Sequence, residues 1–324
     1  MGATLSQFWP PKPILTEKNL PDQSGKVFIV TGSSSGVGRE LAYILYLCNA
    51  KVYVAARSSA KAEKAISEIK TRAPNSKGSL TFLHLDLDDL TTIKASAEAF
   101  LRDNDRLDVL FNNAGVMAPP QGSKTKQGYE LQLGTNCVAP FLFTKLLMPI
   151  LLQTAKTAPA ESVRVVWTSS MGAELFSPKK GVDLDNMDYK NDQSRWRKYG
   201  VSKAGNIFHG QELARRYGGG GIISVSLDPG GLKTEIQRHT PAWQNRIVNL
   251  MLYDAIYGAY TELYAGLSPH VNASHNGTYI APWGRLHYPL RKDLVLSAKP
   301  ESEGGSGQAL KFWEWNEEQV KPYL

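Results

Sequence analysis

The stretch KVFIVTGSSSGVG, residues 26–38, decides the fold of this chain. Residues 26–30 form an apolar, β-branched run typical of a strand, and a helical pattern follows from Gly38. Between them, glycines permit a tight turn and a close approach of the backbone to a ligand. A helix that begins at such a turn offers free N–H groups and a positive dipole end to a pyrophosphate. The stretch favours a dinucleotide-binding βαβ unit, although a glycine pattern alone also fits a plain turn.

Strand-like and helix-like patterns alternate along the rest of the chain. Runs typical of strands recur at residues 51–55, 80–85, 108–112, 163–168, 222–227 and 277–281. Helical patterns stand between them, at about residues 61–72, 90–101, 129–152 and 198–216. This alternation predicts a parallel sheet, and nearly continuous apolar strands indicate that helices cover both faces. We expect an α/β fold, a single doubly wound Rossmann domain with a seven-stranded parallel sheet.

Composition shifts divide the chain into three parts. Residues 1–24 are rich in proline and polar residues and are expected to form an N-terminal arm. Residues 25–298 carry the strand and helix patterns of the catalytic domain, and residues 299–324 are expected to form a C-terminal tail. Within the domain, residues 232–267 are apolar and aromatic, so we expect one or two helices that lie over the cleft as a substrate lid.

The composition excludes several classes of function. The net charge is +7, but basic and acidic residues are interspersed, so nucleic-acid binding is not expected. The two cysteines, Cys48 and Cys137, predict no disulfide and fit a reducing, cytoplasmic location. No ligand spacing joins the histidines, so no metal is expected. Residues 138–152 are too short an apolar run to span a bilayer, and a lipid on Gly2, which would bring membrane contact, fits only a permissive pattern.

Arg57 follows the second strand at the position where NAD sites usually carry an acid. A guanidinium suits a ribose 2′-phosphate, so Arg57, with Ser33 and Ser58 nearby, favours NADP. The alternative is a solvated loop charge. Asp86-Leu87 and Asn112-Asn113-Ala114-Gly115 follow the next two strands, where ligands of parallel sheets bind. These residues alone do not distinguish a turn from a site.

Tyr199 and Lys203 lie four residues apart in a helical pattern, which places both side chains on one face. Tyrosine ordinarily has a pKa near 10, and a nearby cation lowers it by favouring tyrosinate. Such a pair can exchange a proton with a carbonyl oxygen. The same spacing is common on ordinary helices, so the pair needs the support of other motifs.

Taken together, these motifs resemble those of the short-chain dehydrogenase/reductase family. The pattern comprises TGxxxGxG at residues 31–38, NNAG at 112–115, a serine after the fifth strand, YxxxK at 199–203 and PG at 229–230, in the order of the classical members. The stretch SPKKGVDLDNMDY, residues 177–189, resembles the retinol-dehydrogenase-like branch, and the N-terminal arm resembles that of fungal members.

The resemblance implies a role for each matched catalytic residue. Tyr199 would be the general acid for reduction, and Lys203 would lower its pKa and hold the nicotinamide ribose. Ser170 would bind the substrate oxygen, and Asn136 would anchor a water in a proton relay. Counting back from Gly172 favours Ser169 instead of Ser170, so that choice stays open with Ser170 preferred.

The resemblance also implies the residues that bind NADP. They are Gly32, Ser33, Ser35, Gly36, Val37, Gly38, Arg57, Asp86, Leu87, Asn113, Ala114, Gly115, Tyr199, Lys203, Pro229, Gly230, Leu232 and Thr234.

The sequence thus predicts an NADP(H)-dependent oxidoreductase that interconverts a carbonyl and an alcohol. The apolar segment 232–267 suggests a lipophilic small-molecule substrate. Two alternatives stay open: a carbon–carbon double-bond reductase, and an NADP-binding interaction protein with a vestigial site. The sequence does not exclude a homo-oligomer.

Overall fold

The computed structural model describes residues 6–7, 9–233 and 252–324, and its centre is a parallel sheet. The strand order is β3-β2-β1-β4-β5-β6-β7, and every neighbouring pair is parallel. The strands are β1 (Val27–Thr31), β2 (Lys51–Ala56), β3 (Ser79–His84), β4 (Val109–Asn112), β5 (Val163–Thr168), β6 (Ile222–Leu227) and β7 (Tyr279–Ile280). This confirms the predicted seven-stranded parallel sheet of a Rossmann-like fold. The order reverses between β1 and β4, which is where such sheets bind ligands.

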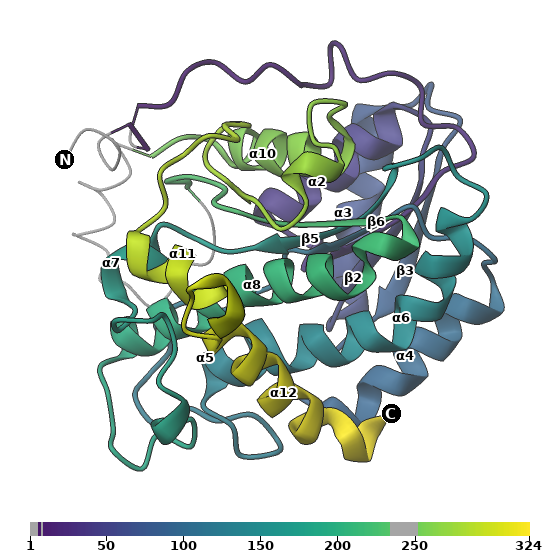
Figure 1. Cartoon of the computed structure of the whole chain (residues 1–324). Helices are drawn as coiled ribbons and strands as arrows, with labels where there is room; N and C mark the ends of the chain where they lie inside the picture. The colour runs from purple at the N-terminus through teal and green to yellow at the C-terminus, as the bar shows by residue number, and fades with distance from the viewer. Residues whose placement is uncertain (1–5, 8, 234–251) are drawn as a thin grey trace.

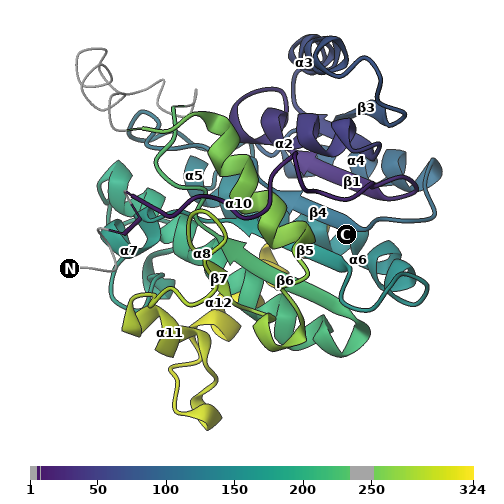
Figure 2. The ribbon, with the colours of Figure 1, turned by 90° about the horizontal axis from the view of Figure 1, so that it is seen from above.

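Helices cover both faces of the sheet (Figure 1). One layer contains α2 (Gly36–Leu47), α3 (Ser59–Arg72) and α10 (Ala255–Leu267), and the other contains α4 (Leu90–Arg102), α6 (Ala139–Ala155) and α8 (Arg195–Tyr217). Figure 2, seen from above, shows α2 and α10 in front of the strands. Side chains alternate along a strand, so Phe28 and Val30 pack under the first layer, whereas Ile29 packs under the second.

The remaining helices are short or lie outside these layers. They are α5 (Leu131–Leu133), the π-helical turn η1 (Gly134–Val138), α7 (Gly172–Phe176), α11 (Lys292–Ala298), α12 (Gln308–Val320), and the 3₁₀ turns η2 (Leu184–Asn186), η3 (Gly218–Gly220), η6 (Ala273–His275), η7 (Glu301–Glu303) and η8 (Lys321–Tyr323). The run Leu131–Ala155 is long and apolar enough to cross a membrane by composition. Of its most apolar window, 78% is buried inside the fold, so its apolarity belongs to the core.

The segment expected to be a substrate lid is in part a core helix. Helix α10 packs on α2 and behind β4, β5 and β6, and its Ala259 and Leu263 are fully buried. Its apolar residues therefore serve the doubly wound core, so residues 255–267 do not lie over a cleft. The expected lid residues 234–251 fall outside the described part of the chain.

The two appendages expected at the chain ends pack on the domain. Helix α12 buries Phe312 and Trp313 against α8, and Trp313 meets the ring of Phe141 with 4.7 Å between centroids. The buried positions of α12 recur at helical spacing, a pattern that composition alone had hidden. The N-terminal arm runs over the α2 and α10 side (Figure 1), where Glu17 accepts a hydrogen bond from Tyr260 at 2.7 Å.

Candidate active site

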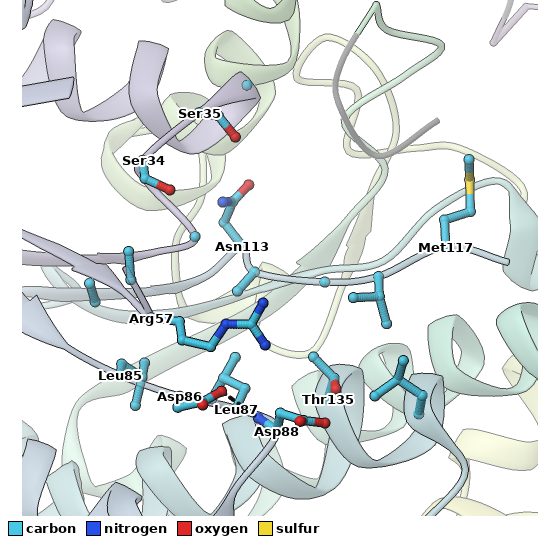
Figure 3. A pocket seen from close by; sticks show the side chains of 18 of the residues that line it. Ser34, Ser35, Arg57, Leu85, Asp86, Leu87, Asp88, Asn113, Met117 and Thr135 are labelled. Atoms are coloured by element: carbon cyan, nitrogen blue, oxygen red, sulfur yellow. Dashed lines mark hydrogen bonds between the residues drawn. The ribbon is translucent and has the colours of Figure 1, made fainter. Parts of the chain in front are cut away.

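A groove of about 630 Å³ lies at the carboxyl ends of β1, β2 and β4 (Figure 3). It brings together many of the residues predicted to bind the cofactor. Those that line it are Gly32, Ser35, Gly36, Val37, Arg57, Asp86, Leu87, Asn113, Ala114 and Gly115. The groove is also lined by residues that sequence reasoning missed, including Ser34, Asp88, Met117, Lys124 and Thr135. Several of them belong to no short motif and reach the groove only because the chain folds back.

Glycines let the turn after β1 pack directly on the turn after β4. Gly32 and Gly36 adopt φ values of +70° and +57°, a region that disfavours side chains. A Cβ on Gly32 would lie 2.8 Å from the Ala114 Cα, and one on Gly38 would lie 2.5 Å from the Asn113 Nδ2. Asn113 itself donates to the Thr31 carbonyl at 2.6 Å. Gly38 therefore permits close packing beneath the groove, and it does not line the groove.

The three serines of the turn after β1 differ in direction. Ser33 is fully buried, and its hydroxyl donates to the Val30 carbonyl at 2.7 Å. The Ser33 hydroxyl therefore closes the turn, and the predicted binding of NADP by Ser33 stays a prediction. Ser34 and Ser35 line the groove instead (Figure 3). Ser58 caps α3 by accepting from the Lys61 backbone N–H.

Arg57 is exposed and reaches into the groove beside Asp86 and Asp88 (Figure 3). Asp86 also accepts a hydrogen bond from the Asp88 backbone N–H at 3.1 Å. The same groove carries Lys124, so two cations and two carboxylates line it. A polar wall of this kind can hold the ribose and phosphate groups of a dinucleotide.

Helix α8 brings Tyr199 and Lys203 to the carboxyl end of β5. Both side chains are buried, and the Lys203 Nζ lies 5.8 Å from the centroid of the Tyr199 ring. Lys203 Nζ donates to the Thr168 carbonyl at 2.9 Å. A Cβ on Gly172 would lie 2.7 Å from the Tyr199 Cε1, so the loop after β5 needs a glycine there to admit the ring.

The two serines after β5 have different surroundings. Ser169 is buried, and its hydroxyl donates to the Lys203 carbonyl at 2.7 Å. The Ser170 side chain lies beside Tyr199 and accepts from the Gly172 backbone N–H at 3.0 Å. Ser170 thus stands beside the phenol, whereas Ser169 fastens the loop to α8.

Burial dominates the protonation of this pair. It raises the pKa of Tyr199 to about 12, against the opposing hydrogen bond from Ser170. It also lowers the pKa of Lys203 to about 8. Burial is the larger influence on the phenol, and the predicted lowering of the Tyr199 pKa by Lys203 stays a prediction. The Lys203 ammonium is directed at the Thr168 carbonyl.

Asn136 lies in the π-helical turn η1 and joins three segments. Its Oδ1 accepts from the Val116 N–H at 2.8 Å, and its Nδ2 donates to the Val116 carbonyl at 3.0 Å. The Nδ2 also donates to the Ser202 hydroxyl at 2.9 Å. Asn136 thus fixes the segment after β4 against α8. Its predicted role in a water relay stays a prediction.

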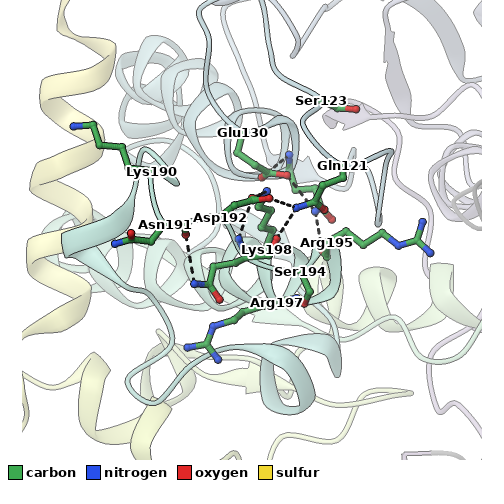
Figure 4. Close-up of polar contacts among 12 residues, drawn as sticks. Gln121, Ser123, Glu130, Lys190, Asn191, Asp192, Ser194, Arg195, Arg197 and Lys198 are labelled. Carbon is green, nitrogen blue, oxygen red and sulfur yellow. Dashed lines mark hydrogen bonds and ion pairs between the residues drawn. The ribbon is translucent and has the colours of Figure 1, made fainter.

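The start of α8 is held by polar contacts with the loops around the groove (Figure 4). Lys198 pairs with Asp192 at 2.5 Å, and Gln121 Nε2 donates to the same carboxylate at 2.6 Å. Gln132 Nε2 donates to the Arg195 carbonyl at 3.0 Å. These contacts set the position of the helix that carries Tyr199 relative to the groove.

Comparisons with known proteins place this site in a family. The model of the short chain dehydrogenase family matches residues 26–182. A short-chain dehydrogenase/reductase of the fungus Phomopsis amygdali is 53% identical and aligns over 98% of this chain and 96% of its own. A short-chain dehydrogenase/reductase of Emericella nidulans is 50% identical and aligns over 96% of this chain and 98% of its own. The chain belongs to the short-chain dehydrogenase/reductase family.

Solved structures agree on the fold. A crystal structure of a Mycobacterium paratuberculosis protein superposes with a TM-score of 0.69 and 26% identity, over 95% of this chain and 97% of its own. A short chain dehydrogenase of Shigella flexneri complexed with NADP has a TM-score of 0.59 and 22% identity, over 79% and 96%. The two relatives of 53% and 50% identity, both fungal, confirm the predicted family membership.

This short-chain dehydrogenase/reductase contains two buried carboxyls near Lys203 that sequence reasoning missed. Glu262 on α10 accepts from the Thr168 hydroxyl at 2.9 Å, and burial raises its pKa to about 8. Asp228 follows β6 directly, and burial raises its pKa to about 6. Glu262 gives no signal in the sequence because it stands within an apolar helix. Asp228 precedes the PG motif, which was the available signal.

Pro229, Gly230 and Leu232, also predicted to bind the cofactor, do not line this groove. Gly230, with a φ of +91°, faces Pro282 and Trp283, and Leu232 is buried near Gly258. Pro229 belongs to the same turn after β6, and Thr234 falls outside the described residues. Within residues 6–7, 9–233 and 252–324, no cluster of three potential metal ligands occurs.

Proposed function

We propose that this short-chain dehydrogenase/reductase uses NADP(H) to interconvert a carbonyl and an alcohol on an apolar small molecule. The observation that carries the proposal is the convergence of Ser170, Tyr199 and Lys203 beside a groove built on a glycine turn. The groove suits a dinucleotide because Gly32 and Gly36 leave room for close backbone approach and the N-terminus of α2 opens onto it. NADPH, when bound, supplies the hydride for the carbonyl carbon.

The residues of the chain supply the proton and its orientation. Burial keeps Tyr199 protonated at neutral pH, so its hydroxyl can donate a proton to the substrate oxygen during reduction. Ser170 lies beside the phenol and is placed to stabilise developing charge on that oxygen. Lys203, held on the Thr168 carbonyl, stabilises the tyrosinate that remains.

The NADP preference rests on Arg57, which stands in the groove where an acid would bind the 2′-hydroxyl of NAD. The Shigella flexneri neighbour is complexed with NADP, which agrees with this choice. Two cysteines that form no disulfide are consistent with a cytoplasmic location. Membership of the retinol-dehydrogenase-like branch and a homo-oligomeric state stay predictions.

The apolar nature of the substrate rests on aromatic side chains near Tyr199. Phe176 and Trp196 remain 37% and 36% exposed, and their ring centroids lie 5.4 Å apart. Trp196 lies 6.5 Å from the Tyr199 ring, centroid to centroid. An apolar ligand that covers exposed aromatic surface of this kind is bound more tightly, because apolar surface is removed from water.

A turnover screen tests the proposed function. NADPH consumption is measured with a panel of ketones, aldehydes and enones, and the products are identified. We expect alcohols from apolar carbonyls, and a loss of about 10²- to 10⁴-fold in kcat for Tyr199→Phe. Tyr217→Phe, on the same helix but at its far end, is the matched control and should keep the rate. Saturated ketones from enones, or an unchanged rate in Tyr199→Phe, would contradict the proposal.

A further inference from the structure

Asp228 joins two loops that the proposed mechanism needs. It follows β6 directly and is 3% exposed. Its Oδ1 accepts from the Gly230 backbone N–H at 3.0 Å, which closes the turn after β6. Its carboxylate also lies near the Met171 backbone N–H, in the loop after β5. The Ser169 N–H of that loop donates to the Leu227 carbonyl, next to Asp228, at 2.7 Å. One buried carboxylate therefore holds the ends of two neighbouring strands.

Both loops bear on the reaction. Met171 follows Ser170, and Gly172 comes next, where a Cβ would lie 2.7 Å from the Tyr199 ring. The turn at Pro229 and Gly230 is the one expected to cradle the nicotinamide. We propose that Asp228 is a positioning residue that sets the distance between the Ser170 loop and this turn and supplies a fixed negative charge behind them. The proposal rests on the proposed function for its link to catalysis.

The charge of Asp228 acts on a crowded group of titratable side chains. The side chains that interact with it through Coulomb forces are Glu174 on α7, Tyr199 and Lys203 on α8, Tyr279 on β7 and Arg285 after β7.

The effect on the catalytic phenol follows from Coulomb's law. A carboxylate near Tyr199 disfavours tyrosinate, and Asp228 contributes to the raised pKa of this phenol. The pKa of Asp228 is about 6, so the carboxylate is ionised at neutral pH. It adds to the effect of burial on Tyr199, and the same charge favours the ammonium of Lys203. Asp228 thus raises the pH at which Tyr199 ionises.

Two substitutions separate the geometric role from the charge. Asp228→Asn keeps an acceptor for the Gly230 N–H and removes the charge, whereas Asp228→Ala removes both. Glu212→Gln, a buried carboxyl on α8 that pairs with Arg215 and Arg216, is the matched control. NADPH affinity is measured by fluorescence, Tyr199 ionisation by ultraviolet difference titration against Tyr199→Phe, and kcat and KM as a function of pH.

We expect Asp228→Ala to weaken NADPH binding and to lower kcat/KM about 10- to 100-fold. Asp228→Asn should stay within about tenfold of wild type near neutral pH, but its alkaline limb and its Tyr199 titration should move to lower pH. Below the pKa of Asp228 the wild type and Asp228→Asn should converge, because both then carry no charge. Glu212→Gln should match the wild type throughout.

Unchanged NADPH affinity, unchanged Tyr199 titration and unchanged kcat/KM in both Asp228 variants would overturn the proposal. Binding and titration need no turnover, so they test Asp228 even where the screen finds no substrate. In contrast, a Tyr199→Phe variant with full activity would contradict the proposed function. The NADPH affinity of the Asp228 variants would still test whether Asp228 positions the two loops.

Discussion

The two halves of the sheet build function in different ways. In the half formed by β1 to β4, the groove residues that sequence predicted follow their strands within short motifs, as in the glycine turn and Asn113-Ala114-Gly115. In the half formed by β5 to β7, the site is assembled from distant segments. Lys203 meets Thr168 across 35 residues, and Thr168 meets Glu262 across 94.

The difference shows what each half requires of the chain. A dinucleotide groove needs backbone N–H groups and little side-chain bulk, which local turns provide. Proton chemistry needs buried side chains at fixed distances, which only packing between separate elements provides. Four substitutions test this contrast, in order of expected free-energy effect.

The largest effect on free energy should come from α12, which completes the core on the β5 to β7 half of the sheet. Trp313→Ala removes a side chain that is 2% exposed and packed on Phe141, so we expect a loss of about 3–5 kcal/mol in the free energy of unfolding. Urea unfolding followed by circular dichroism measures it. Leu310→Ala, on the exposed side of the same helix, should cost less than about 1 kcal/mol. Equal effects for both would mean that α12 is an appendage after all.

The next effect separates the two serines. Ser170→Ala removes a donor beside Tyr199, so we expect kcat to fall about 10²- to 10³-fold, or about 2.7–4 kcal/mol. Ser169→Ala loses a hydrogen bond to the Lys203 carbonyl and should reduce kcat by less than about tenfold. Steady-state kinetics with NADPH decides, and the opposite ranking would make Ser169 the catalytic serine.

The β1 to β4 half of the sheet is tested through Arg57, which follows β2 and lines the groove. Arg57→Asp should lower the ratio of kcat/KM for NADPH over NADH by about 10- to 100-fold, because the 2′-phosphate loses a cation and meets a carboxylate. Lys70→Asp changes the net charge equally at the far end of α3 and should leave the ratio unchanged. A ratio that Arg57→Asp does not move would remove Arg57 from cofactor selection.

The smallest effect concerns the buried carboxyl on α10. Burial raises the pKa of Glu262 to about 8, so the folded state binds a proton that the unfolded state has released. The contribution of Glu262 to the free energy of unfolding is fully present below the pKa that Glu262 has in the unfolded chain. It is lost as the pH rises through the folded-state pKa of about 8. We expect the stability of Glu262→Gln relative to wild type to rise with pH between about pH 5 and about pH 9, by about 1 kcal/mol or more. A difference that does not vary with pH would show that Glu262 titrates normally.

Sequence reasoning predicted the first half better than the second. Gly32, Arg57 and Asn113 were placed in the groove because a turn keeps its residues together wherever the chain goes. The direction of the Ser33 hydroxyl could not be predicted, because only the hydrogen bond of the folded turn to the Val30 carbonyl sets it. The lid expected over residues 232–267 was misjudged in part because apolar spacing does not say which surface a helix covers.

The sequence by itself determined the parallel sheet, the family and the spacing of Tyr199 and Lys203, because periodicity and short motifs act over a few residues. Only the tertiary structure decided which serine stands beside the phenol, that α12 completes the core, and that Asp228 and Glu262 lie near Lys203. It also decided the protonation of the pair. A pKa depends on burial and on neighbours from distant segments, and neither is written in the local pattern.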